Sequence, residues 1–274
     1  MLFGFDEKKE EDLFVGTSGF SFPDWIGKVY PDGLSKGRMF DYYVKIWRFN
    51  ALEVNFTYYS SPSKRTIISF LRRSPENFMF IFKAPKLITH DAWKKGEMEE
   101  VKENIEDFLR ILEPLKSGGK LGGILLQFPY SFKRSSANID YLGAVSMDFK
   151  DGNVDIFIEF RNVSWAVKDT FDFLRSIGSN YVIVDEPRLP GLFPYIPEFT
   201  GDIAYFRFHG RNERWFEADG SERYDYLYSS EELEKLADDV KKIRKNAKKT
   251  FIFFNNCHNG SAVKNALEFR ELLT

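Results

Sequence analysis

The chain has 274 residues and a formal net charge of −2, from 39 Lys and Arg against 41 Asp and Glu, and 43% of its residues are hydrophobic. This apolar fraction suffices for a packed core, which excludes a collagen-like, a disulfide-rich or a disordered chain. The small net charge excludes a generally basic nucleic-acid binder, so a nucleic-acid partner would require a local positive patch. The one cysteine, Cys257, excludes an internal disulfide and a zinc site built from several thiolates.

The N-terminal segment has no features of a targeting sequence. Residues 1–12 are too few and too acidic for a secretory signal peptide, and no window approaches the roughly 20 apolar residues that span a bilayer. We therefore expect a cytoplasmic protein without a membrane partner. No linker divides the chain, so we expect one domain over residues 1–274, with residues 1–11 as a short acidic extension.

Short apolar runs rich in β-branched and aromatic residues predict eight buried strands along the chain. They cover residues 13–17, 51–57, 78–84, 121–128, 154–160, 180–185, 203–209 and 250–255. Segments with helical spacing lie between most of them, including 101–115, 230–247 and 260–273. The second of these helices is expected to start at Ser230, which is followed closely by Glu232 and Leu233.

This alternation of strands and helices predicts a closed (β/α)₈ barrel of the TIM type, because parallel strands need long crossover connections. No GxGxxG motif follows the first strand, so an open doubly wound sheet fits less well. The links that follow strands are long (18–36, 85–100 and 210–229), on the side where such barrels carry their active sites. Residues 186–202 contain four prolines, and we expect an irregular segment there in place of the sixth helix.

Polar side chains occur near the carboxyl ends of strands that should otherwise be apolar. A buried unpaired charge costs several kcal/mol, so these groups either pair with one another or line a solvated mouth. For single residues both interpretations stay open, whereas the set as a whole favours a polar pocket at the carboxyl rim. The charged members are Glu53, Lys83, Glu159, Arg161, Asp185, Arg207 and His209, and the amide members expected to bind a ligand are Asn55, Gln127, Asn255 and Asn256.

Each charged member has an expected role in such a pocket. The carboxylates of Glu159 and Asp185 are acid/base candidates, and His209 is a candidate proton shuttle. The guanidinium groups of Arg161 and Arg207 would stabilise developing negative charge. Lys83 and Glu53 complete the set of catalytic candidates by holding the electrostatics of the pocket.

A divalent metal is one hypothesis for the three histidines. His90, His209 and His258 follow the third, seventh and eighth strands, which predicts that they share one face of the barrel. Together with carboxylates at the strand ends, they could ligate zinc or manganese. No HExxH spacing is present, so a catalytic or hydrogen-bonding histidine is the alternative.

The loops after the seventh and eighth strands are candidate phosphate-binding segments. In this fold such loops hold phosphate through backbone N–H groups and a helix N-terminus. The residues concerned are Arg207, Arg211 and Arg214, which could make bidentate contacts, and the turn formed by Asn259, Gly260 and Ser261. The alternative is that Arg214 pairs with Glu213 or Glu217 at the surface, where such pairs contribute little stability.

Aromatic residues crowd the same loops. Tyr58, Trp165 and Trp215 are candidate ligand-binding residues, because aromatic faces near cations suit sugar rings or nucleobases, each base stack contributing about 1–3 kcal/mol. The alternative is that they are hydrophobic plugs beneath long loops. Cys257 lies beside His258, but neighbours in sequence rarely face each other, and we do not expect a nucleophilic cysteine.

Several motifs together resemble those of the YecE-like family, also described as domain of unknown function 72. The resemblance begins near residue 15, continues to the C-terminus and implies a (β/α)₈ barrel without supplying an activity. Members are compared with endonuclease IV-like and xylose isomerase-like barrels, whose metal centres use many histidines; three histidines do not fit a trinuclear centre. The motifs are GTSG (16–19), EVNFTYY (53–59), KAP (83–85), TH (89–90), LQFP (126–129), EFR (159–161), SW (164–165), VDEP (184–187), YFRFHG (205–210) and FNN (254–256).

Three functions remain open from the sequence. The first is an enzyme, with a hydrolase as one class, that acts by acid/base chemistry on a small anionic ligand such as a phosphoester or a sugar phosphate. The second is a non-catalytic module that binds nucleic acid or carbohydrate. The third is a metal-dependent hydrolase of the endonuclease IV-like type, a suggestion that rests on fold analogy.

Overall fold

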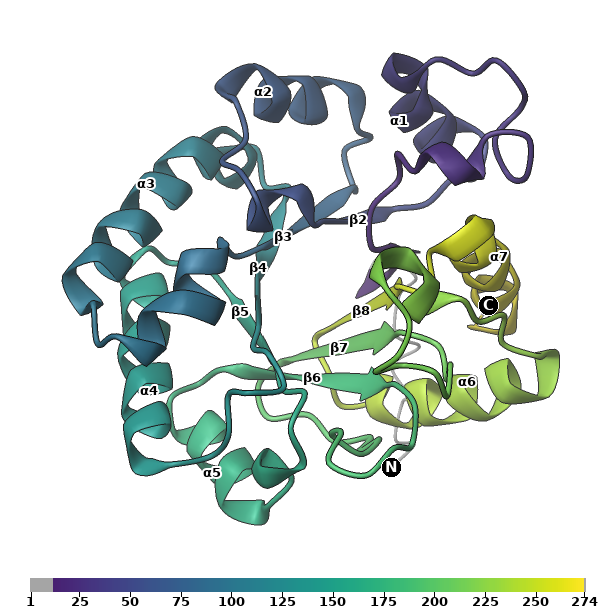
Figure 1. Cartoon of the computed structure of the whole chain (residues 1–274). Coiled ribbons are helices and arrows are strands. Elements are labelled where there is room, and N and C mark those ends of the chain that lie inside the picture. The colour runs from purple at the N-terminus through teal and green to yellow at the C-terminus, as the bar shows by residue number, and fades with distance from the viewer. Residues whose placement is uncertain (1–11, 274) are drawn as a thin grey trace, which may run out of the picture.

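The computed structural model describes residues 12–273, and the expected acidic extension over 1–11 lies outside them. In the described residues eight parallel strands form a barrel, and helices surround it in chain order (Figure 1). The strands are β1 Leu13–Thr17, β2 Ala51–Val54, β3 Met79–Lys83, β4 Leu121–Gln127, β5 Ile156–Glu159, β6 Asn180–Asp185, β7 Ile203–Phe208 and β8 Lys249–Phe254. The α-helices are α1 Lys36–Lys45, α2 Lys64–Arg73, α3 Met98–Ser117, α4 Ser136–Asp151, α5 Lys168–Ser176, α6 Ser230–Arg244 and α7 Ser261–Leu273.

The predicted (β/α)₈ barrel is confirmed, including its irregular part. The strands pair in the order β1-β8-β7-β6-β5-β4-β3-β2, and each pair is parallel. No helix lies between β6 and β7, where the four prolines deprive the backbone of N–H donors. Six of the eight observed strands differ from the predicted ranges at one or both ends, and the largest difference is at the end of the second strand. The second strand ends at Val54 rather than residue 57, because Asn55 turns the chain into the 3₁₀ turn Phe56–Tyr58. The helix α6 starts at Ser230 as expected, and its N-cap is Ser229, which forms a capping box with Glu232.

The seam between β1 and β2 closes the barrel with few ladder hydrogen bonds. Ser18 and Glu53 form a single bridge, and the N–H of Gly19 donates to the carbonyl oxygen of Glu53 at 2.9 Å. A Cβ on Gly16 would lie 2.1 Å from the carbonyl oxygen of Ala51, so the close approach of the two strands requires glycine there.

The helices pack on the outside of the barrel through their apolar faces. The longest of them, α3, buries Val101, Ile105, Phe108 and Leu112, which recur every three or four residues. Its remaining positions are mostly charged. None of the helices in residues 12–273 is both long and apolar enough to cross a membrane.

The interior of the barrel has an apolar layer and, toward the carboxyl ends of the strands, a polar layer. Because side chains alternate along a strand, residues two apart share a face. Ala51, Ile81, Leu125, Phe157, Tyr205 and Phe253 belong to the buried interior cluster. Two residues farther along each strand come Glu53, Lys83, Gln127, Glu159, Arg207 and Asn255, which we call the polar layer. The apolar layer closes the barrel below, so the polar layer faces the mouth.

Candidate functional site

A cavity of about 470 Å³ opens above the polar layer at the carboxyl mouth of the barrel. We call it the mouth cavity. Its walls combine residues from the strand ends with residues from the long loops after β1, β2, β7 and β8. Among the lining residues are the expected Asn55, Tyr58, Lys83, Gln127, Arg161, Arg207, Asn255 and His258, and also Ser18, Phe22, Asp24, Tyr59, Gly220, Arg223, Tyr224 and Cys257.

Arg207 is held from behind by two carboxylates on opposite parts of the barrel. Its Nε and Nη2 donate to the two carboxylate oxygens of Glu53 at 2.8 and 2.7 Å, and Nη1 donates to Glu159. The hydroxyl of Tyr205 donates to Glu53 as well, at 2.6 Å. Burial would lower the pKa of Arg207, but Glu159 and Glu53 outweigh it and raise that pKa, so the guanidinium stays charged.

Arg161 follows Glu159 by two residues and therefore lies one step nearer to the mouth. Its Nε lies 2.7 Å from Glu159 Oε1, and its Nη1 lies 2.5 Å from Oε2 of Glu186. Burial would raise the pKa of Glu159, but Arg161 and Arg207 outweigh it and hold that pKa well below its usual range. Burial raises the pKa of Glu186 to about 7 despite the opposing effect of Arg161. Glu159 is fully buried and charged, and does not line the mouth cavity.

His209 lies beneath Arg161 and is also fully buried. Its Nε2 is 3.1 Å from Nη2 of Arg161, and its Nδ1 is 2.7 Å from Nδ2 of Asn255. Burial and the charge of Arg161 hold the pKa of His209 well below its usual range, so the ring is neutral at neutral pH. In this position the ring orients Arg161 and Asn255.

Lys83 has surroundings unlike those of the two arginines. Its Nζ donates to the amide oxygen of Gln127 at 2.8 Å and lies 4.5 Å from the ring centre of Tyr58. Within residues 12–273, no carboxylate lies within 4 Å of it. Burial, followed by the charge of Arg207, lowers the pKa of Lys83 to about 7. The residue as a whole is half-buried and lines the mouth cavity.

Asp185 and Arg211 belong to a separate cluster. Arg211 binds both carboxylate oxygens of Asp185 at 2.8–3.1 Å and also contacts Glu232 at 2.7 Å. Tyr228 donates a further hydrogen bond to Asp185 at 2.6 Å. Asp185 is buried and lines neither the mouth cavity nor the cavity described next. The carboxylate of Asp185, an expected acid/base group, therefore has no open space beside it for a ligand.

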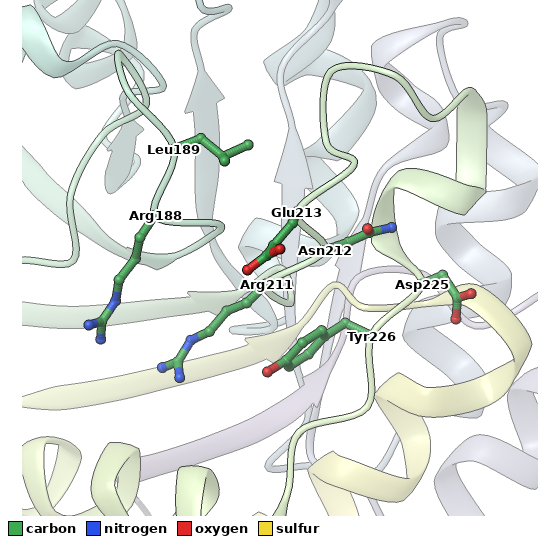
Figure 2. Close-up of a pocket in the computed structure, with 7 residues that line it drawn as sticks. All are labelled: Arg188, Leu189, Arg211, Asn212, Glu213, Asp225 and Tyr226. Carbon is green, nitrogen blue, oxygen red and sulfur yellow. The ribbon is translucent and has the colours of Figure 1, made fainter.

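A second cavity, of about 640 Å³, lies outside the barrel mouth between the β6–β7 and β7–α6 connections (Figure 2). The side chains of Arg188, Arg211 and Tyr226 extend in the same direction along it. Two acidic residues, Glu213 and Asp225, also line this outer cavity. Because the signs are mixed and Arg211 is already paired, it offers an anion less free positive charge than the mouth cavity.

Four other expected residues have structural contacts. Trp165 is fully buried and donates its Nε1–H to the carbonyl oxygen of Phe132, which fits a plug beneath the loops. The amide of Asn256 donates to Asn265 and to the backbone of Tyr226. Trp215 is 5% exposed and covers the guanidinium of Arg161 at 5.4 Å, so it shields the site from one side. His90 bonds to Thr89 and packs against Tyr58 behind the cavity.

The histidines do not meet around one point. His90 packs behind Tyr58, His209 is buried under Arg161, and His258 is 3.9 Å from Asp225 at the rim. Across residues 12–273, no group of three His, Cys, Asp or Glu side chains could hold a metal ion. The residues present therefore do not fit the metal centre that the barrel resemblance suggests.

The turn before α7 is occupied by the protein's own carboxylate. The N–H of Asn259 donates to Oδ2 of Asp24 at 2.7 Å. The neighbouring Cys257 is also engaged, since its thiol contacts the carbonyl oxygen of Ser18 at 3.3 Å, and burial raises its pKa. A phosphate at this turn would have to displace Asp24.

Some residues of the site were not identified from the sequence. Glu186, the second partner of Arg161, directly follows Asp185, but only the fold shows which way each points. Arg223 and Tyr224 come from the 3₁₀ turn Gly220–Tyr224, which folds back over the mouth. The length of the link after the seventh strand was the available signal, because such loops build the mouth of this fold.

Comparison with known proteins identifies relatives over almost the whole chain. The family model described as "Protein of unknown function DUF72" matches residues 14–274. A crystal structure of a DUF72 family protein from Thermotoga maritima is 49% identical, covers 95% of this chain and 98% of its own, and has a TM-score of 0.90. Another, from Enterococcus faecalis, is 30% identical, covers 95% of each chain and has a TM-score of 0.81. The UPF0759 protein YunF of Bacillus subtilis is 28% identical over 275 residues, 95% of this chain and 94% of YunF.

Proposed function

The chain belongs to the DUF72 family of proteins of unknown function, and we propose from the geometry of its barrel mouth that it is an enzyme acting on a small anionic ligand, a phosphoester or a sugar phosphate. The observation that carries this proposal is the distribution of charge around the mouth cavity. Lys83, Arg161, Arg207 and Arg223 line it, whereas Asp24 is its one acidic lining residue among the described part of the chain.

The carboxylates that pair with Arg161 and Arg207 lie behind these cations rather than in the cavity. Glu53 and Glu159 are 0% exposed and neutralise Arg207 and Arg161 from the barrel interior. Among residues 12–273, the lining cations without a carboxylate within 4 Å are Lys83 and Arg223, and the lining carboxylate of Asp24 offsets one of these charges. An anion in the cavity would meet cations first, in a site partly shielded from water where such attraction is stronger.

The same arrangement changes the expected catalytic roles. Since Glu159 is held charged by two guanidinium groups and has no open space beside it, we assign it and Glu53 to positioning Arg161 and Arg207. Lys83 becomes the acid/base group, because a pKa of about 7 allows it to accept and donate a proton near neutral pH. His209 positions Arg161.

The aromatic lining supports a ligand with a ring or a carbon skeleton. Phe22, Tyr58, Tyr59 and Tyr224 line the mouth cavity, and Tyr59 is 84% exposed. Aromatic faces beside cations can stack on a sugar ring while the cations hold its phosphate. A cavity of about 470 Å³ falls within the range of about 300–1,000 Å³ that small-molecule sites occupy.

Titration calorimetry tests this proposal with ribose 5-phosphate, fructose 6-phosphate and the two sugars without phosphate. We expect the phosphorylated forms to bind and Lys83→Met or Arg223→Met to weaken binding at least about tenfold, or about 1.4 kcal/mol. Arg188→Met, in the outer cavity, is the matched control and should bind like the wild type. If Arg188→Met alone loses binding, the anion-binding site is in the outer cavity instead. If no binding depends on the phosphate group, the proposal is refuted.

A further inference from the structure

Lys83 combines three features that an acid/base group does not need together. It lies at the end of β3 with its amine on the mouth cavity, its polar partner is a neutral amide, and a ring face covers one side. A lysine that serves only to attract an anion has no need of partial burial beside Arg207. These features are those of an amine kept free to react with carbon.

The partner of the amine determines whether its lone pair is available. A carboxylate within hydrogen-bond distance would hold the third proton on Nζ, as ion pairs do. The amide oxygen of Gln127 accepts one N–H without carrying a charge. At pH 7 a lysine with a pKa of about 7 is about half uncharged, whereas an ordinary lysine with a pKa near 10.4 is uncharged in about one molecule of 2,500.

Lys120 shows what a structural lysine looks like in the same protein. Its Nζ donates to the carbonyl oxygens of Leu71 and Ser74 and to the hydroxyl of Ser74, at 2.7–3.2 Å. These three acceptors use all three of its protons, and Lys120 does not line the mouth cavity. Within residues 12–273, Lys83 Nζ has one hydrogen-bond acceptor, Gln127, and the ring of Tyr58 covers one further side, which leaves the rest of the amine to the cavity.

We infer that Lys83 forms an imine with the carbonyl carbon of a small anionic aldehyde or ketone, such as an open-chain sugar phosphate or a 2-oxo acid, bound in the mouth cavity. This inference rests on the proposed function and names the substrate class more closely. The anionic group would lie against the lining arginines, of which Arg223 is the one without a carboxylate partner within 4 Å among residues 12–273. Lys83 lines the same cavity, where its Nζ would attack the carbonyl carbon.

The step balances without an oxidant or a reductant. The lone pair of Nζ attacks the carbonyl carbon and forms the C–N bond, while the carbonyl oxygen takes up a proton. That oxygen, after a second protonation, leaves as water when the C–O bond breaks, and Nζ keeps one hydrogen in the iminium ion. The whole conversion consumes one proton from solvent and releases one water, and hydrolysis reverses it. The iminium withdraws electrons from the adjacent carbon, which favours proton removal or carbon–carbon cleavage there.

Reductive trapping tests the imine directly. The full-length protein is incubated at pH 7 with dihydroxyacetone phosphate, ribose 5-phosphate or pyruvate together with sodium cyanoborohydride, and the modified peptide is identified by mass spectrometry. We expect one adduct, at Lys83, formed at least about tenfold faster than at any exposed lysine because of its larger free-amine fraction. Inorganic phosphate should slow the trapping by competing for the cations.

Two variants and one direct measurement make the result decisive. Lys83→Arg and Lys83→Met should abolish the adduct, and Lys86→Arg, three residues along the same segment with an exposed side chain, should leave it unchanged. If either Lys83 variant unfolds, reductive ¹³C-methylation of the wild type followed by NMR still reports the titration of Lys83. A titration near pH 10 would overturn the inference.

The outcomes separate this inference from the proposed function. Phosphosugar binding by calorimetry with no adduct at Lys83 for any of the three probes would overturn the imine and leave the anion site intact. If neither phosphosugar binding nor reductive trapping is observed, both the imine and the proposed function are overturned. An adduct spread equally over Lys83 and Lys86 would show ordinary surface reactivity and also overturn the imine.

Discussion

Lys83 and Arg207 belong to the same polar layer, but the surroundings of Arg207 stabilise its charged form, whereas those of Lys83 favour its uncharged form. Arg207 is 2% exposed and bound by Glu53 and Glu159, which makes its charge permanent. Lys83 has the amide of Gln127 and the charge of Arg207 nearby, which favours the uncharged amine. A buried cation without an anionic partner lowers stability, and we therefore expect a measurable cost at Lys83.

Lys83→Met should stabilise the protein by about 1–3 kcal/mol at pH 7 and below, a figure reduced for the partial solvation of the amine. The pKa of Lys83 is lowered from 10.5 to about 7. Between those values the unfolded chain binds more protons than the folded one, so the stability of the wild type rises with pH over that range. The advantage of Lys83→Met should therefore shrink as pH rises from about 7 toward 10.

Urea denaturation at pH 6, 8 and 10 measures this difference. Lys86→Met is the matched control, because that side chain is 55% exposed, and its stability should differ little from the wild type at every pH. A constant difference between Lys83→Met and the wild type across the three pH values would contradict the lowered pKa.

The sequence made Lys83 a candidate but did not reveal its chemistry. A charge at the end of a predicted apolar strand was enough to select Lys83, Glu159 and Arg207 as a set. What separates them is the partner, and Gln127 is 44 residues away from Lys83. Pairing between side chains of different strands depends on strand order and register, which a single sequence does not specify. For the same reason Glu159 was expected to be an acid/base group, although it is buried between two guanidinium groups.

At the scale of elements, the seam between β1 and β2 is held by side-chain hydrogen bonds, because few backbone hydrogen bonds join these two strands. The hydroxyl of Tyr43 on α1 accepts from the N–H of Thr17 at 2.9 Å and donates to the carbonyl oxygen of Ala51 at 2.8 Å. Asn50 likewise accepts from the N–H of Val15 at 2.8 Å and donates to the carbonyl oxygen of Leu13 at 2.7 Å. Two side chains therefore bridge the two strands and close the barrel.

Tyr43→Phe should destabilise the protein by about 2–4 kcal/mol, since it leaves a buried N–H and a buried carbonyl oxygen unpaired at about 1–3 kcal/mol each. Tyr42→Phe, at the next position of α1, is the control, because the Tyr42 hydroxyl makes no hydrogen bond within residues 12–273; it should change stability little. Chemical denaturation measures both. Equal stability of the two variants would show that the seam does not depend on the hydroxyl of Tyr43.

The strands and helices were easier to predict from the sequence than this seam. Alternating apolar runs predicted all eight strands, and helical spacing predicted α3, α6 and α7, because burial of one face leaves a periodic pattern. The bridge made by Tyr43 and Asn50 has no periodic signal. Each is a single polar side chain, and its function depends on which backbone atoms the fold brings beside it.

At the scale of the whole molecule, the polar layer ties distant strands together through charge. Glu53 comes from β2, Glu159 from β5 and Arg207 from β7, and these strands are not neighbours in the sheet. Their side chains meet because all point into the barrel one layer above its apolar interior. The network thus crosses the space that the hydrophobic residues do not fill, and it holds the floor of the mouth cavity in place.

Glu53→Gln should therefore destabilise the whole barrel by about 3–5 kcal/mol, because Arg207 would lose one of its two anionic partners while remaining buried. Asp202→Asn breaks the exposed pair with Lys248 and is the matched control, with an expected loss of about 0–1 kcal/mol. The double variant Glu53→Gln/Arg207→Met also removes the buried guanidinium that has lost a partner, and it should recover part of the lost stability. Urea denaturation of the four proteins at pH 7 completes the comparison. A double variant less stable than Glu53→Gln alone would show that the guanidinium contributes through packing rather than through its pairing with Glu53.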